Sequence, residues 1–345
     1  MSAVSVLGAG MVTAVGFNYP SSSAAIRAGI KGLRAANLWD AENGEYLTAA
    51  KVDLPQWWEG TGKLADLVAP AIWECLKQAE PERPEAIPIL LAVAPPDRPA
   101  RLRESDVEIL DEVEWRLGLP RHPESGLVSL GNVSGLVALV QARKLLAGGK
   151  VRFCIVAGVD SFLQQEVVES YMEKSRIMTE SNSNGFFPGE AGGAVLVGLS
   201  GMGTEGELKI LGIGFGVEPA TIGSEEPFQG KGLTKACRDA LAEAHVPMHL
   251  VAYRNTDLNG EHYKFKEASY AQTRLLKQRV EKQELWHLSE CVGEIGAAYV
   301  PCVLAMSLHA GRKQFAPGSR CLCHFSGDGP ERGACVVEFE QRGTS

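Results

Sequence analysis

The sequence predicts an α/β protein in which one unit of strands and helices occurs twice. Short apolar runs rich in β-branched residues alternate with helical patterns along the whole chain. The order of strands and helices in residues 1–203 is similar to that in residues 204–345, and each series ends in a pair of strands. Because the apolar runs are continuous rather than alternating, we expect sheets with helices packed on both faces.

The first series is expected to hold four strands and two helices. Apolar runs predict the strands, and apolar residues at helical spacing predict the helices. The strands are expected at residues 4–7, 87–93, 151–157 and 194–197, and the helices over 64–79 and 133–146. The stretch 95–124 combines Pro, Gly and charge with weak periodicity, so it is expected to form a loop or cap.

The second series follows the same plan after a join near residues 198–206. Strands are expected at residues 208–215, 250–253, 321–325 and 334–339, with helices over 232–244, 264–280 and 297–309. Residues 221–230 are rich in Gly and charge and are expected to form a loop.

Composition limits the partners and the compartment. The chain has 345 residues and a net charge of −8, and its Lys and Arg residues are scattered, which disfavours nucleic acid as a partner. It contains no apolar run of about 18 residues that could span a membrane. The first residues show neither a basic segment nor a cleavage site, so we expect no membrane partner and a cytoplasmic protein.

The cysteine pattern predicts neither a disulfide framework nor a metal site. None of the eight cysteines forms a C-x-x-C pair, and several lie in apolar or helical context, where reduced and buried thiols are common. Cys321, Cys323 and His324 form a C-x-C-H cluster, but a structural zinc site requires four ligands and no matching pair follows. We therefore expect no metal and no cofactor.

Four regions of the chain, in order, resemble the β-ketoacyl synthases of the thiolase superfamily. The opening strand, glycine turn and first helix of these enzymes are similar to VSVLGAGMVTAVGFN and AIRAGIKGLR. Their nucleophile elbow and central helix are similar to GLVSLGNVSGLVALVQARKLLAGGKVRFCIVAGVDS, and their Gly-Phe and Gly-Glu segment is similar to SRIMTESNSNGFFPGEAGGAVLVG. Their last catalytic helix and final glycine-rich loop are similar to ECVGEIGAAYVPCVLAMSLHAG and HFSGDGPERGACVV.

The resemblance implies a thiolase-like αβαβα sandwich of five layers, made of two pseudo-repeated halves. The half formed by residues 1–203 would carry the nucleophile elbow and the dimer face, and residues 204–345 would form the other half. The resemblance also implies a homodimer, or a heterodimer with another thiolase-fold protein, and acyl-CoA or acyl carrier protein as ligands.

Against this pattern, the catalytic centre of the family is replaced. The family carries a cysteine at the elbow, where a helix amino terminus favours the thiolate that takes up the acyl group. Here the matching position is Asn132, which cannot form a thioester. Asp257 and Glu294 stand where the family has its two histidines, and Ser289 replaces a lysine five residues before the second of them. Two carboxylates would repel a developing oxyanion, so ordinary condensation is not expected.

Each of these residues also has a structural interpretation. Asn132 could cap the helix that follows the elbow. Asp257 and Glu294 could pair with Arg254, His262 or Lys264 in a buried network, or they could act as acid and base on a water molecule.

Other residues are candidates for a nucleophile or for architecture. Ser134 and Cys291 are the nearest alternative nucleophiles, although no base is evident for either. Glu190 matches the Gly-Glu of the family, where a buried carboxylate ties the two halves together, and Arg176 is a candidate neighbour for it. Both residues are expected to be architectural.

Two classes of function remain. The first is a non-condensing dimeric scaffold or partner protein with an acyl pocket as an option, as in the chain-length factors of aromatic polyketide synthases, which lack the cysteine. The second is an acyltransferase or acyl-thioester hydrolase that uses Asp257 and Glu294 as acid and base in the same pocket. A decarboxylase is less consistent with the sequence, because loading ketosynthases with an amide at the elbow keep both histidines.

Overall fold

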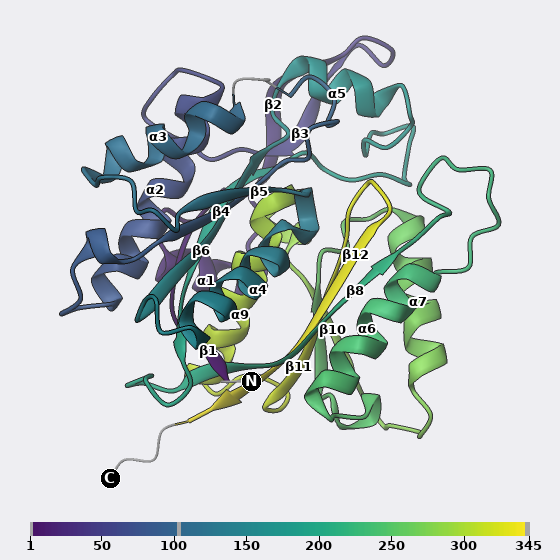
Figure 1. The fold of residues 1–345 in the computed structure, drawn as a ribbon. Helices are drawn as coiled ribbons and strands as arrows, with labels where there is room; N and C mark the ends of the chain where they lie inside the picture. The colour runs from purple at the N-terminus through teal and green to yellow at the C-terminus, as the bar shows by residue number, and fades with distance from the viewer. Residues whose placement is uncertain (1–2, 102–104, 342–345) are drawn as a thin grey trace.

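The computed structural model describes residues 3–101 and 105–341, and ten of its strands form one large sheet (Figure 1). The sheet has the order β10-β9-β11-β12-β8-β1-β7-β6-β4-β5. The two central strands, β1 and β8, pair over only a few residues, Val4 to Val6 with Leu208 to Ile210. The sheet therefore consists of two parts of five strands that are joined at one end.

The two parts repeat one topology. The first contains β1 (Val4–Thr13), α2 (Thr61–Gln78), β4 (Ile89–Val93), α3 (Ser105–Leu117), β5 (Gly126–Ser129), α4 (Ser134–Ala147), β6 (Phe153–Ser161) and β7 (Glu190–Leu199). The second contains β8 (Glu207–Val217), α6 (Lys231–Ala244), β9 (Tyr253–Thr256), α7 (His262–Leu275), β10 (Glu284–His287), α9 (Tyr299–Arg312), β11 (Arg320–Ser326) and β12 (Glu331–Glu340). In the first part, β7 pairs antiparallel with β1 and with β6, and in the second part β12 pairs antiparallel with β8 and with β11. The remaining pairs in both parts are parallel.

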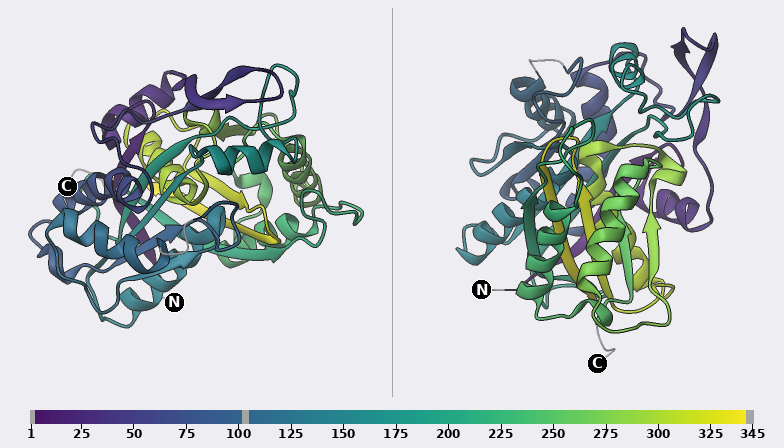
Figure 2. Two further views of the ribbon diagram at one scale, coloured as in Figure 1. Left: turned by 90° about the horizontal axis from the view of Figure 1, so that it is seen from above. Right: turned by 90° about the vertical axis from the view of Figure 1, so that its right-hand side faces the viewer.

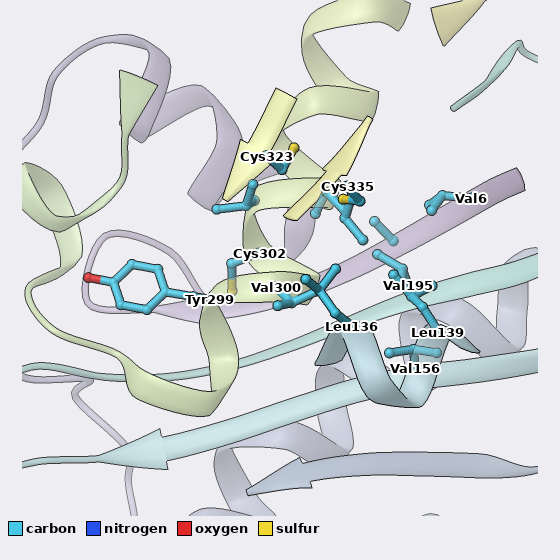
Figure 3. Close-up of a cluster of buried hydrophobic side chains, with 14 of the residues drawn as sticks. Val6, Leu136, Leu139, Val156, Val195, Tyr299, Val300, Cys302, Cys323 and Cys335 are labelled. Atoms are coloured by element: carbon cyan, nitrogen blue, oxygen red, sulfur yellow. The ribbon is translucent and has the colours of Figure 1, made fainter. Parts of the chain in front are cut away.

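Helices α4 and α9 lie between the two parts of the sheet, and the other long helices cover its outer faces. Figures 1 and 2 show α2 and α3 on the outside of the first part and α6 and α7 on the outside of the second. The arrangement is a thiolase-like αβαβα sandwich, as predicted. Its central layer packs against strands from both parts (Figure 3), through buried residues that include Val6, Leu136, Leu139, Val156, Val195, Tyr299, Val300, Cys302, Cys323 and Cys335.

Smaller elements form a cap and the connections. They are α1 (Tyr19–Arg27), the hairpin of β2 (Leu33–Asp40) and β3 (Glu45–Ala50), α5 (Gln165–Met172), α8 (Ser289–Val292), and the 3₁₀ turns η1 (Pro84–Ala86), η2 (Gly131–Val133), η3 (Met248–Leu250) and η4 (Gly296–Ala298). Among the described residues, none of the helices combines the length and the apolar character that crossing a membrane requires.

Most predicted elements are present, and three predictions need correction. The stretch 95–124 is not only loop, because it contains α3, whose Ile109 and Val113 are buried in the outer core of the first part; its residues 102–104 lie outside the described residues. The strand expected at 250–253 starts only at Tyr253, after the 3₁₀ turn η3. The helix expected to reach residue 280 ends at Leu275.

The division between residues 203 and 204 falls in the connection between β7 and β8 and stays a prediction. Residues 1–2 and 342–345, at the ends of the two predicted halves, lie outside the described residues.

Candidate functional site

The elbow after β5 directs Asn132 toward the second half of the molecule. Gly131 has φ +58°, a left-handed conformation that a glycine adopts without steric cost, and it turns the chain from β5 into η2 and α4. The Asn132 Nδ2 atom donates to Asp257 Oδ2 at 2.9 Å and to Glu294 Oε1 at 3.4 Å. Asn132, Asp257 and Glu294, which the resemblance matches to the catalytic positions of the family, therefore meet, although they come from distant parts of the chain.

Asn132 does not cap the helix that follows it, so that interpretation was wrong. The first turn of α4 has no side-chain cap. Ser134 Oγ instead accepts from the backbone N–H of Leu130 at 2.7 Å and donates to the Val93 carbonyl at 3.3 Å. These bonds fix the elbow and leave the Asn132 amide to the two carboxylates.

Lys264, in the first turn of α7, completes this group. Its Nζ atom lies 3.1 Å from Asp257 Oδ2 and 3.7 Å from Glu294 Oε2. Of the three cations considered from the sequence, Lys264 is thus the partner, whereas the Arg254 guanidinium donates to Gln272. We call Asn132, Asp257, Asn259, Lys264 and Glu294 the inner cluster.

Backbone and side-chain donors fix the orientation of both carboxylates. The backbone N–H of Ser326 donates to Asp257 Oδ2 at 2.9 Å, and that of Gly296 donates to Glu294 Oε1 at 3.0 Å. The Asn259 amide donates to Glu294 Oε2. Because all its members are at least nine-tenths buried, the cluster is a preorganised polar network in a site of low dielectric.

The inner cluster holds two carboxylates and one ammonium, and its burial shifts the pKa of Glu294. Burial raises the pKa of the Glu294 carboxyl to about 7, and the Asp257 carboxylate adds to this effect while Lys264 opposes it. Burial acts to lower the pKa of Lys264, but the two carboxylates raise it overall, so its ammonium stays charged. Glu294 is therefore the member of the cluster that can gain or lose a proton near neutral pH.

The inner cluster faces a cavity of about 690 Å³ through Asn132, Lys264 and Glu294. The cavity wall is strongly polar. It includes six acidic residues and four basic ones: Asp97, Asp160, Glu261, Glu294, Asp328 and Glu331, with Arg98, Lys174, Arg176 and Lys264. This excess of acids gives the cavity a negative potential, which disfavours anionic ligands.

A further ion pair forms part of the cavity wall. Arg98 pairs with Asp160 and stacks on the Phe162 ring at 3.8 Å, and Asp160 also accepts from the backbone N–H of Ala297 at 3.1 Å. Because Asp160 belongs to β6 and Ala297 to η4, this carboxylate joins the two halves.

Arg176, for which an architectural role was predicted, does not pair with Glu190. Its guanidinium makes bonds of 2.7 and 2.9 Å to Glu261 and one of 2.8 Å to Asp328, both in the second half. Glu190 contacts Lys63 at 2.9 Å, and its other hydrogen bonds among the described residues are to Val52 and Ser161 of the first half. Contacts of Arg176 and Asp160, rather than of Glu190, thus connect the two halves.

The alternative nucleophiles do not reach the cavity wall. Ser134 is fully buried beneath the elbow. Cys291 lies in α8 and packs into the central core, and burial together with Glu290 raises the pKa of its thiol.

The described residues contain no group of three or more His, Cys, Asp or Glu side chains arranged to hold a metal ion. Cys321 and Cys323 lie in the central core, with 3.7 Å between their sulfur atoms. His324 lies on the opposite face of β11 because successive side chains of a strand alternate.

Asn259, Asp160 and Asp328 were not predicted as site residues. Asn259 has a local signal, since it follows Asp257 by two residues. Asp160 and Asp328 carry no comparable signal, because their partners Arg98 and Arg176 lie far away in the sequence.

Comparisons with known proteins identify the fold. No protein-family model matches this sequence, and a search of the curated proteins gives no match. Among solved structures, a ketosynthase from module 6 of the bacillaene synthase of Bacillus subtilis 168 is 14% identical with a TM-score of 0.79, over 98% of this chain and 72% of that chain. A β-ketoacyl synthase from Burkholderia phymatum STM815 is 16% identical with a TM-score of 0.74, over 99% of this chain and 100% of that chain.

A ketosynthase in complex with its chain length factor, from Xenorhabdus doucetiae, is also similar. It is 14% identical with a TM-score of 0.73, and the match covers 98% of each chain. This chain therefore has the β-ketoacyl synthase-like fold of the thiolase type, as the sequence motifs predicted.

Proposed function

We propose that this protein is a ketosynthase-like scaffold that does not condense acyl chains and acts as a dimer, with itself or with another thiolase-fold protein. The observation that carries the proposal is the bond of 2.9 Å between the Asn132 amide and the Asp257 carboxylate. By the sequence resemblance, Asn132 matches the family nucleophile and Asp257 matches a family histidine, and neither group can perform the family chemistry.

The elbow offers no nucleophile for acyl transfer. An amide nitrogen is not nucleophilic, and the hydrogen bonds of Asn132 to Asp257 and Glu294 hold it in place. Ser134 lacks a base, because its hydroxyl bonds only to backbone groups among the described residues. An acyl group brought into the cavity would thus have no atom at the elbow to attach to.

The inner cluster is also unsuited to stabilise an oxyanion. Asp257 and Glu294 would face the developing negative charge, and the nearby Lys264 ammonium already pairs with both. The acidic wall of the cavity also disfavours acyl-CoA, which carries several phosphate charges.

The fold supports association through the first half. Among the described residues, strand β5 is the last strand of the sheet on that side, so one of its edges can pair with another strand. Its sequence GLVS contains neither charge nor proline, the usual features that block such pairing. A second copy or another thiolase-fold chain could continue the sheet there, and one structural neighbour is a ketosynthase in complex with its chain length factor.

One observation favours a second candidate, an acyl-thioester hydrolase or acyltransferase. Glu294 lines the cavity, and burial raises the pKa of its carboxyl to about 7. A carboxyl group with this pKa can serve as a general base for water or for a hydroxyl substrate at neutral pH. Asp257 would then orient the cluster through Asn132 and Lys264 rather than take part in proton transfer.

Intact-protein mass spectrometry separates these candidates. The protein is incubated with acyl-CoA and acyl carrier protein donors, and the free acid and the acylated protein are followed together. The scaffold proposal predicts neither product, and light scattering of the same sample should give the mass of a dimer.

Two matched variants complete this experiment. An acyl adduct on Asn132→Cys, but not on the wild type, would show that donors reach an elbow without a nucleophile, in agreement with the proposal. A stoichiometric adduct on the wild type would refute it. Free acid that forms with the wild type and is lost with Glu294→Gln would instead establish the hydrolase.

A further inference from the structure

The second half of the molecule contains a small cavity of about 10 Å³ between the sheet and its outer helices. Strands β9 and β11 form its floor, and α6, α7 and the turn η3 cover it. Most of its lining is apolar, but it includes Arg254 and His324. Both side chains have buried nitrogen atoms without a hydrogen-bond partner among the described residues.

Arg254 is a buried cation that has no counter-ion among the described residues. The residue is 6% exposed, and its guanidinium donates to Gln272 Oε1 at 2.9 Å. Within the part of the chain that the structure describes, its Nε–H has no hydrogen-bond partner and it forms no ion pair. An arginine stays charged in proteins, and a buried charge without a partner is strongly destabilising.

Two neighbouring groups could in principle neutralise Arg254, but one is uncharged and the other is already paired. Burial raises the pKa of the Cys237 thiol to about 12, so this cavity residue stays neutral. Glu267, on the neighbouring helix α7, bonds to Arg332 at 2.7 Å and to Ser326 at 2.6 Å through its two oxygens.

His324 supplies a second donor that has no protein partner. It is 2% exposed, and neither ring nitrogen has a hydrogen-bond partner among the described residues. Parallel pairing sets Arg254 beside Leu322, so the side chains of Arg254 and His324 lie on the same face of the sheet. Burial and the nearby charges of Arg254 and Lys264 lower the pKa of His324 to about 3, so its ring is neutral and offers one N–H.

We propose that this cavity binds a single chloride ion between the Nε–H of Arg254 and the ring N–H of His324. The ion would neutralise the guanidinium and accept from both unpaired donors. The cavity has about the volume that a single water-sized occupant needs. Met248 forms part of the wall, and its flexible thioether chain can adjust to the somewhat larger radius of a halide. The proposal does not depend on the function proposed above.

Thermal unfolding in different sodium salts tests the proposal. At constant ionic strength and pH 7.5, chloride and bromide should raise the Tm by about 2 °C over gluconate, which is too large to enter, and the rise should saturate. Arg254→Met should abolish the difference between the salts, whereas Arg279→Met, at an exposed position of the same half, should keep it. An equal Tm in all three salts would overturn the proposal, because the cavity would then hold only water.

Diffraction from bromide-soaked crystals of the unaltered protein gives a second measurement, which does not depend on the folding of a variant. An anomalous peak between Arg254 and His324 is expected. Bromide peaks confined to the protein surface would contradict the proposal.

Discussion

Helix α7 carries two buried charges one turn apart, Lys264 and Glu267, and their surroundings differ in charge balance. Lys264 is one ammonium beside two carboxylates, Asp257 and Glu294, at the wall of the cavity. Glu267 is one carboxylate beside one guanidinium, that of Arg332, and neither of these side chains is exposed.

The Arg332–Glu267 pair is saturated with hydrogen bonds. Its charges meet at 2.7 Å, Ser326 donates to the second oxygen of Glu267, and the remaining guanidinium donors reach the Tyr263 hydroxyl and three backbone carbonyls. Because its two charges balance, the pair holds β12 against α7.

The inner cluster has two states of charge, because Glu294 can hold or release a proton near pH 7. The comparison teaches that burial alone does not mark a functional site, since both groups are buried. What distinguishes the inner cluster is its excess of acid and its contact with the cavity. Variants at the two groups should therefore differ in size of effect and in dependence on pH.

The largest effect is expected for Arg332→Met. This change leaves the Glu267 carboxylate buried without its counter-ion, which should lower the free energy of unfolding by about 4 kcal/mol. Urea denaturation measures the loss. The double variant Arg332→Met/Glu267→Gln should recover part of it, because a neutral amide replaces the unpaired charge.

A matched control comes from an exposed ion pair. Lys235 and Asp239 form a surface pair on α6, and Lys235→Met should cost about 0.5 kcal/mol or less. If Arg332→Met cost no more than this control, the buried pair would not have the architectural role assigned to it.

The sequence predicted the fold well because its signals are local and repeated. Apolar runs in the same order in both series place eight of the ten strands of the large sheet and the two central helices. The two short edge strands, β5 and β10, were not predicted. Helix α3 was missed because charged residues interrupt its apolar face, whose Ile109 and Val113 are visible only when packed against α2.

The composition of the site was harder to predict than its location. The family motifs placed Asn132, Asp257 and Glu294, but whether they touch depends on the packing of two distant halves. Arg176 was a candidate neighbour of Glu190, yet its partners Glu261 and Asp328 come from loops of the other half. Contacts between loops of different halves leave no periodic pattern in the sequence.

A smaller effect, but one that depends on pH, is expected for Glu294→Gln. The pKa of Glu294 is raised from 4.5 to about 7, so between these values the folded protein holds a proton that the unfolded chain has lost. The unfolded state then binds fewer protons, and the free energy of unfolding falls by about 3 kcal/mol as the pH rises from 4.5 to 7. This contribution is constant above pH 7.

Glu294→Gln should remove this fall, as the difference between the stability curves of variant and wild type will show. Glu290→Gln is the matched control, because Glu290 is exposed and close in sequence. Parallel curves for Glu294→Gln and the wild type would mean that the carboxyl is ionised throughout, and the hydrolase candidate would lose its support.

The smallest effect is expected for Asn132→Ala, which tests whether the elbow amide is part of the inner cluster or only near it. The amide donates to both carboxylates, and the loss of a hydrogen bond to a charged group costs about 2 kcal/mol. The cost should be lower at pH 5 than at pH 8, because the hydrogen bond from Asn132 stabilises a protonated, neutral Glu294 carboxyl less than it stabilises the carboxylate. Denaturation at the two pH values measures both quantities. An equal cost at both pH values would show that Asn132 stabilises only the Asp257 carboxylate. Glu294 could then act on a ligand in the cavity without a hydrogen bond from Asn132.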